Sequence, residues 1–189
     1  MKCFIFSILL YGASTSIIEA QDMPVPVEVQ YPLFLKIFTF DRNFHSRADE
    51  GIAIGILYQS EYRKSLNVRN AFIDIINNFP LRDVDGAPIR YVSIDITRES
   101  DLRAAVKREG IDLFYIAPLR AVDISTITGI SREQHVLTLT GVPEYVIDGV
   151  SVSIDVKGDK PLIVINLPAA KAEGVDFDAQ LLKLAKVIR

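Results

Sequence analysis

Short β-rich runs alternate with amphipathic helical patterns along most of this chain, and this alternation constrains its fold more than any other feature. The β-rich runs cover residues 51–57, 89–94, 113–116 and 136–140. Helical patterns stand between them, such as the one in which Val68, Phe72 and Ile76 recur at steps of four. Strands and helices that alternate in this way are typical of parallel sheets with helices on both faces. The sequence therefore predicts an α/β fold with a doubly wound, mainly parallel sheet.

The last quarter of the chain changes this rhythm. Residues 151–156 and 162–166 are β-rich and flank the turn sequence Lys157-Gly-Asp-Lys-Pro161. This arrangement predicts an antiparallel hairpin. A final helix is expected after Asp178, whose carboxylate can cap it. The inner face expected for this helix consists of Leu181, Leu184, Ala185 and Ile188.

The first twenty residues differ in character from everything that follows. A single charged residue, Lys2, precedes an apolar run over residues 3–18, and a small residue, Ala20, follows it. The run contains polar and small residues and is short for a membrane span, which needs about 20 strongly apolar residues. The pattern predicts a signal peptide over residues 1–20, cleaved after Ala20, and one domain over residues 21–189. An uncleaved N-terminal anchor is the alternative.

Charge and cysteine content exclude two classes of function. The formal net charge of −3 provides no basic surface for nucleic acid. The only cysteine, Cys3, lies within the predicted signal peptide. A cleaved chain would therefore have neither disulfide nor thiol chemistry, and its stability would come from its core.

No residue pattern in the chain predicts catalysis. The only two histidines, His45 and His135, are far apart and have no cysteine partners, which makes a poor transition-metal set. The sequence Asp83-Val-Asp85-Gly86 resembles a fragment of a calcium loop, but it lacks the remaining ligands and is expected to form a turn. We therefore expect no metal, no cofactor and no enzymatic activity. An exported hydrolase ranks third among the functional hypotheses, because no nucleophile–base set is present.

The segment over residues 27–44 is apolar on most sides. Periodicity alone does not separate a buried strand from a buried helix here. A helix is favoured because apolar residues recur at steps of three or four along one stripe. The stripe consists of Val29, Leu33, Ile37, Phe40 and Phe44. Phe34, Lys36 and Phe38 lie off this stripe, so we expect them to form a contact surface for self-association or for a partner.

An open, mainly parallel sheet leaves a crevice at the carboxyl ends of its strands, and ligands bind there in such folds. The residues at these ends include Tyr58, Gln59 and Ser60 after the first strand and Thr140 and Gly141 after the fourth. They predict a pocket for a small ligand. Ordinary connecting loops would have the same composition, and the sequence leaves both interpretations open.

Three segments of the chain are familiar when they are taken together and in order. They are residues 31–40, residues 52–57, and the ending from Ile165-Asn-Leu-Pro-Ala-Ala170 through Gly174 to Leu181, Leu182 and Ala185. In this order they resemble the YfiR family of bacterial periplasmic proteins. The resemblance extends over essentially the whole predicted mature chain. It implies a three-layer α/β fold like one lobe of a periplasmic binding protein.

The resemblance also implies a function. The protein would be a non-enzymatic regulator in the periplasm that binds the sensory domain of a membrane diguanylate cyclase, or of a histidine kinase. By repressing a cyclase it would lower cyclic-di-GMP and restrain biofilm formation. Dimerisation is implied too, whereas disulfide-based redox control is not expected, because the cysteine pairs known in the family are absent. The alternative is a periplasmic module that binds an unknown small solute.

Overall fold

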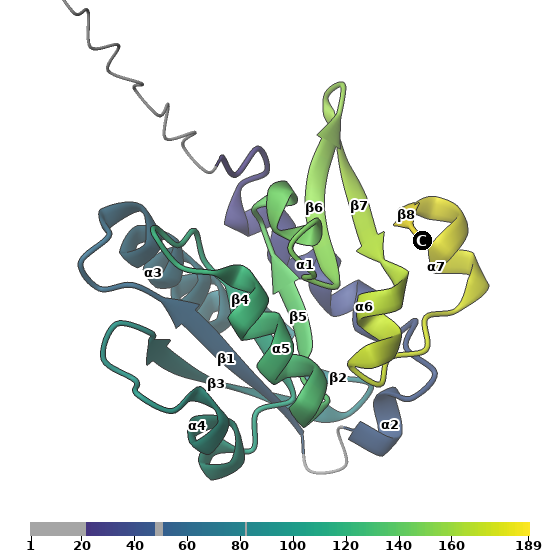
Figure 1. Cartoon of the computed structure of the whole chain (residues 1–189). Coiled ribbons are helices and arrows are strands. Elements are labelled where there is room, and N and C mark those ends of the chain that lie inside the picture. The colour runs from purple at the N-terminus through teal and green to yellow at the C-terminus, as the bar shows by residue number, and fades with distance from the viewer. Residues whose placement is uncertain (1–21, 48–50, 82) are drawn as a thin grey trace, which may run out of the picture.

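The computed structural model describes residues 22–47, 51–81 and 83–189, so the predicted signal peptide lies outside the described residues. The described part contains one eight-stranded sheet in the order β2-β3-β1-β4-β5-β6-β7-β8. Helices cover both faces of this sheet (Figure 1). The three-layer α/β architecture predicted from the sequence is therefore confirmed.

Parallel strands form the centre of the sheet. They are β3 (Ala87–Asp95), β1 (Ile52–Tyr58), β4 (Leu113–Ile116) and β5 (Leu137–Thr140). Ile54 of β1 lies opposite Tyr91 of β3 on one side and opposite Leu113 of β4 on the other. Strands β1 and β4 are apolar and buried along nearly their whole length because helices cover both of their faces.

Antiparallel pairs extend the sheet towards both ends. Strand β2 (Asp83–Val84) pairs with β3 through a turn at Asp85 and Gly86, both of which have positive φ angles. Strand β6 (Val152–Lys157) lies parallel to β5 and pairs antiparallel with β7 (Lys160–Asn166). This confirms the predicted hairpin. A short strand, β8 (Lys186–Ile188), lies parallel to β7.

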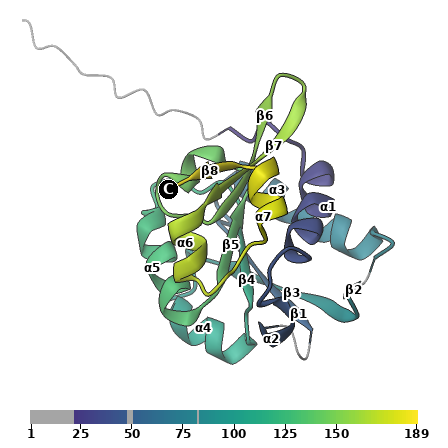
Figure 2. The ribbon, with the colours of Figure 1, turned by 90° about the vertical axis from the view of Figure 1, so that its right-hand side faces the viewer.

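The helices form the two outer layers (Figure 2). On one face of the sheet lie α1 (Val27–Phe38), α3 (Arg63–Asn78) and α7 (Ala179–Leu184), and on the other lie α4 (Leu102–Glu109), α5 (Ile124–Gln134) and α6 (Leu167–Ala172). Two further short helices are α2 (Phe44–Arg47) and η1 (Pro143–Val146).

Alternate residues of each central strand fill two separate cores. Ile54 packs in the core against α1 and α3, whereas Ala53 packs in the core against α4 and α5. The ring of Phe114 occupies the space beside Gly55, so a side chain at this position would not fit. An added Cβ at Gly55 would lie 2.9 Å from Cδ1 of Phe114.

Helix α1 buries a different face from the one predicted. Its buried residues are Val27, Gln30, Tyr31, Phe34, Leu35, Ile37 and Phe38. Phe34 is 1% exposed and Phe38 is 4% exposed, whereas Val29 of the predicted inner stripe is 40% exposed. The prediction that Phe34 and Phe38 form an exposed contact surface is therefore wrong, because both rings belong to the core.

The physical reason lies in the length of α1 and in its packing partner. The predicted stripe assumed one continuous helix as far as Phe44, but α1 ends at Phe38 and Asp41 forms an isolated bridge with Phe177. Ring packing against α3 then sets the rotation of α1. The rings of Tyr31 and Phe72 meet edge to face with centroids 5.5 Å apart.

The C-terminal helix is shorter than predicted. Asp178 caps α7 as expected, because its carboxylate accepts a hydrogen bond of 2.7 Å from the backbone N–H of Gln180. The helix ends at Leu184, which is exposed, and the next residues pair with β7 as β8.

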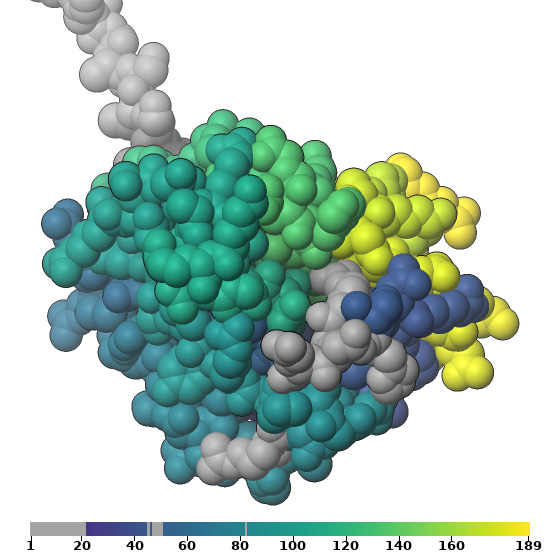
Figure 3. All heavy atoms as spheres, turned by 90° about the horizontal axis from the view of Figure 1, so that it is seen from below, coloured from purple at the N-terminus to yellow at the C-terminus, as the bar shows by residue number. Residues whose placement is uncertain are grey.

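Seen from below, the C-terminal segment lies against residues near α2 (Figure 3). There Arg42 donates to Asp178 at 3.0 Å.

Candidate functional site

The residues predicted to line a strand-end crevice are engaged in internal hydrogen bonds. The side chain of Gln59 donates to the backbone carbonyl of Arg120 at 3.1 Å and accepts from its N–H at 2.6 Å. This pair joins the loop after β1 to the loop after β4. Thr140 donates its hydroxyl to the carbonyl of Ile116 at 2.9 Å. These contacts join the two central loops to each other and the end of β5 to the end of β4.

Three other predicted crevice residues are also held by neighbours. The backbone N–H of Ser60 donates to Asp95 at 3.3 Å, and the ring of Tyr58 lies under the guanidinium of Arg69 at 5.1 Å. Burial by itself would raise the pKa of Asp95. Hydrogen bonds from Ser60 and Thr97 outweigh this effect, so the pKa of Asp95 is lowered. A Cβ added at Gly141 would clash with the buried side chain of Gln30.

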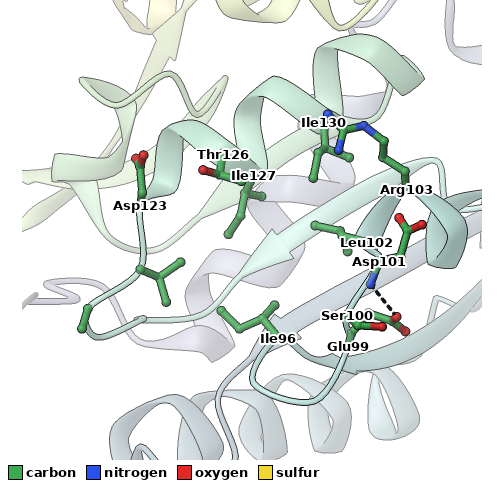
Figure 4. Close-up of a pocket in the computed structure, with 12 residues that line it drawn as sticks. Ile96, Glu99, Ser100, Asp101, Leu102, Arg103, Asp123, Thr126, Ile127 and Ile130 are labelled. Atoms are coloured by element: carbon green, nitrogen blue, oxygen red, sulfur yellow. Dashed lines mark hydrogen bonds between the residues drawn. The ribbon is translucent and has the colours of Figure 1, made fainter.

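The pocket at this edge of the sheet lies one loop away from the predicted crevice, between the N-termini of α4 and α5. Its volume is about 440 Å³. Figure 4 shows its walls, which come from the loop after β3, the loop after β4 and the two helices. The residues that line it include Ile96, Glu99, Asp101, Leu102, Arg103, Val122, Asp123, Ile127 and Ile130.

Sequence reasoning missed this pocket, although one local signal pointed to it. Asp101 and Asp123 are helix N-caps that follow two strands of the same parallel sheet. Each could be recognised as a cap from the sequence. That their two loops face each other across an apolar hollow depends on the tertiary arrangement of α4 and α5.

A second hollow, the α1 groove, lies between α1 and the segment around β2. Its volume is about 480 Å³, and it is lined by Pro32, Leu35, Lys36, Thr39, Phe79, Leu81, Asp83, Val84 and Asp85. Leu81 is 57% exposed. Lys36 is exposed, and its ammonium group lies 5.4 Å from the centroid of the Phe40 ring. Of the three predicted contact residues, Lys36 alone therefore lies at an accessible position.

A buried carboxylate, Glu173, stands at the centre of a hydrogen-bonded cluster that the sequence did not reveal. Glu173 follows α6, is fully buried, and accepts hydrogen bonds from the hydroxyls of Ser131, Thr138 and Ser151 and from the N–H of Thr138. Burial raises the pKa of Glu173, and the hydrogen bonds only partly offset this effect. The cluster joins α5, β5, β6 and α6, so its role is structural.

The described part of the chain contains neither a metal-ligand cluster nor a helix that could span a membrane. Among residues 22–47, 51–81 and 83–189, no group of three or more His, Cys, Asp and Glu side chains could hold a metal ion. None of the helices in these ranges is long and apolar enough to cross a membrane.

The fold is similar to that of several solved structures, each 14% identical in sequence. An ABC domain in complex with L-Trp from Streptococcus pneumonia gives a TM-score of 0.56 over 82% of this chain and 61% of that one. A conserved domain protein from Vibrio cholerae gives 0.58 over 87% and 60%. The ligand-free, open structure of a substrate binding protein with adhesive properties from Clostridium difficile gives 0.52 over 78% and 57%.

This chain thus covers less than two thirds of each of these three structures. At such low identity the similarity concerns the fold alone, and it agrees with the predicted likeness to one lobe of a periplasmic binding protein. No curated protein sequence matches the chain.

A family model described as YfiR/HmsC-like matches residues 35–186, which is most of the chain. The family is regulatory and periplasmic, and it acts with membrane signalling proteins in cyclic-di-GMP signalling in general. The resemblance inferred from the sequence is confirmed, and the chain belongs to the YfiR/HmsC-like family.

Proposed function

We propose that this protein binds the periplasmic sensory domain of a membrane-bound diguanylate cyclase and holds that enzyme inactive, without catalysing a reaction itself. The observation that carries the proposal is the family match over residues 35–186. A histidine kinase is the alternative partner. Self-association, which the sequence resemblance implies, stays a prediction that sedimentation velocity can test.

The mechanism would be selective binding to one state of the partner. A bound protein shifts a two-state equilibrium only by the difference between its affinities for the two states. A difference of about 1.4 kcal/mol changes the ratio of states tenfold. To repress the cyclase strongly, this protein must therefore make contacts with the inactive sensory domain that the active one does not offer.

The α1 groove is the surface that we assign to the partner. It combines an apolar lining with the exposed side chain of Leu81 and the exposed charge of Lys36. Interfaces typically combine an apolar centre with a polar rim, as this groove does. Phe34 and Phe38 are buried in the core, so we do not assign them to the partner surface.

Deletion of the gene tests the proposal. Cyclic-di-GMP and surface attachment should rise in the deletion strain, and a copy that carries residues 1–189 should restore both. A copy that lacks residues 1–20 should fail to restore them, because we also propose export with cleavage after Ala20. Cyclic-di-GMP that stays unchanged in the deletion strain under several growth conditions would exclude the cyclase as the target.

A second candidate function is the binding of a small solute in the pocket between α4 and α5. The volume of this pocket, about 440 Å³, falls within the range typical of small-molecule sites. A solute bound there could tune the affinity for the membrane partner. Mass spectrometry of protein purified from the periplasm under native conditions would detect a retained solute and would also show whether the chain begins after Ala20.

A further inference from the structure

The pocket between α4 and α5 has an apolar floor. It is formed by Ile96, Leu102, Val122, Ile127 and Ile130. Ile127 belongs to the core beneath α4 and α5, and Ile96, Leu102 and Val122 are partly buried against that core. The floor is therefore the open margin of a hydrophobic core, and it offers contacts to an apolar chain or ring.

Carboxylates stand at opposite ends of this floor. Figure 4 shows Asp123 at one end and Glu99 and Asp101 at the other, with Leu102 and Ile127 between them. Hydrogen bonds from Ser125 keep the pKa of Asp123 below its usual range, so Asp123 is ionised at neutral pH. The Asp123 end of the pocket is thus negatively charged, and the other end carries the carboxyl groups of Glu99 and Asp101 next to Arg103.

The basic side chains near the pocket are held by other carboxylates. Arg103 forms two hydrogen bonds with Glu133, at 2.6 and 3.0 Å, which direct its charge to α5. Arg108 lies 2.9 Å from Glu109 and 3.4 Å from Glu99, so it offsets part of the Glu99 charge. Arg103 also interacts with the charge of Asp101, so Asp123 and the uncompensated part of Asp101 supply the remaining negative potential.

The two helix N-termini are not open to an anion. Asp101 accepts a hydrogen bond of 3.0 Å from the N–H of Ala104, and Asp123 accepts one of 2.9 Å from the N–H of Ser125. Glu99 in turn accepts from the N–H of Asp101 at 3.1 Å. Backbone donors that bind anions at other helix starts are here paired with the protein's own carboxylates.

We propose that this pocket binds a short alkyl diamine, with one ammonium group at Asp123, the other at Asp101, and the methylene chain on the apolar floor. The proposal rests on the solute-binding function given above as the second candidate. A diamine has two charged ends separated by an apolar chain, and the pocket has two acidic ends separated by an apolar floor. A dicarboxylate of the same length would face negative charge at both ends.

Titration calorimetry on the purified protein with three probes of equal chain length tests the proposal. The probes are 1,5-diaminopentane, pentylamine and glutarate. We expect the diamine to bind at least about tenfold more tightly than pentylamine, which loses one ion pair, and glutarate not to bind. No binding of the diamine at millimolar concentration, equal binding of diamine and monoamine, or binding of glutarate would each overturn the proposal.

Two substitutions test the assigned ends. Asp101→Asn and Asp123→Asn remove a charge but keep a good N-cap, since asparagine caps helices about as well as aspartate. Each should lower diamine affinity to about that of pentylamine. Asp178→Asn, the same change at the N-cap of α7, is the matched control and should leave binding unchanged. An unaltered affinity in both pocket variants would also overturn the proposal.

These measurements are independent of the membrane partner. Failure of the diamine to bind would remove the ligand and leave repression of the cyclase untouched. Unchanged cyclic-di-GMP in the deletion strain would remove the cyclase and leave the calorimetric result intact.

Discussion

The two faces of the sheet are packed by different chemistry. On the face of α1 and α3, large rings fill the core, and the rings of Phe72 and Tyr115 stack with centroids 3.8 Å apart. On the face of α4 and α5, mostly aliphatic side chains surround the rings of Phe114 and Tyr145, and a buried hydroxyl–carboxylate cluster around Glu173 adjoins them. The first face depends mainly on the fit of rings, whereas the second adds a buried hydrogen-bonded cluster to an aliphatic core.

This difference separates the ring core, which supports stability, from the open margins of the molecule, where binding is proposed. Interlocked rings leave no space for a ligand inside the core, although the α1 groove opens at its outer side, so substitutions within the rings should reduce stability. The second face leaves part of its core margin open between α4 and α5, so substitutions at that margin should affect binding first. The following predictions test this division, in order of decreasing effect on stability.

Phe34→Ala should have the largest effect. The ring is almost fully buried and packs against Tyr115 with centroids 6.1 Å apart, so its removal leaves a cavity. We expect a loss of about 3–5 kcal/mol in the free energy of unfolding, measured by urea denaturation. Val29→Ala on the exposed side of α1 is the control and should change it by less than about 0.5 kcal/mol. A loss below about 1 kcal/mol for Phe34→Ala would revive the surface interpretation of this residue.

Glu173→Ala should have the next largest effect. It leaves the N–H of Thr138 and three buried hydroxyls without their common acceptor, which should cost about 2–3 kcal/mol of unfolding free energy. Glu173→Gln is the matched variant. It keeps the size of the side chain and one carbonyl acceptor, so it should cost less. Equal losses in the two variants would contradict this and show that the second carboxylate oxygen, which glutamine lacks, holds the cluster together.

Glu173 should also make stability depend on pH. Its pKa is raised in the folded protein, so the folded chain binds more protons than the unfolded chain between the two pKa values. The stability contribution is complete below the unfolded pKa of about 4.3 and is lost as the pH rises through the folded-state pKa. As the pH rises through this window, the unfolding free energy of the wild type should therefore fall relative to that of Glu173→Gln. A constant difference across it would contradict the prediction.

Tyr115→Phe should have a smaller effect on the first face. The Tyr115 hydroxyl donates to the side-chain carbonyl of Gln30 at 3.2 Å in a buried position. Its loss should cost about 1 kcal/mol and leave the ring stacking in place. Thermal unfolding can measure this. A loss as large as that for Phe34→Ala would mean that the polar contact, and not ring packing, fixes α1.

Lys36→Glu and Leu81→Ser should barely change stability, because both side chains are exposed. The free energy of unfolding should stay within about 0.5 kcal/mol of the wild-type value. Repression of cyclic-di-GMP in cells should weaken, because both residues line the α1 groove. Lys107→Glu, at an exposed position of α4, is the charge-matched control and should repress normally. Normal repression by both groove variants would place the partner surface elsewhere.

Local chemistry made the central elements predictable. The strand over residues 52–58 is a continuous apolar run, the turn at Gly158 joins two β-rich segments, and the carboxylate of Asp178 caps the last helix. Each of these features depends on residues that are close in the sequence. The resemblance to the YfiR family likewise rests on three local segments of the sequence.

The sequence by itself thus determined the alternation of the four central parallel strands with helices, the hairpin and the family. The tertiary structure decided which face of α1 is buried, because a helix that is apolar on most sides has no single periodic stripe. It also converted residues 186–188 into β8, since the free edge of β7 supplied hydrogen bonds that the helix end lacked. The pocket likewise required the fold, because Asp101 and Asp123 face one hollow only after α4 and α5 pack side by side on the sheet.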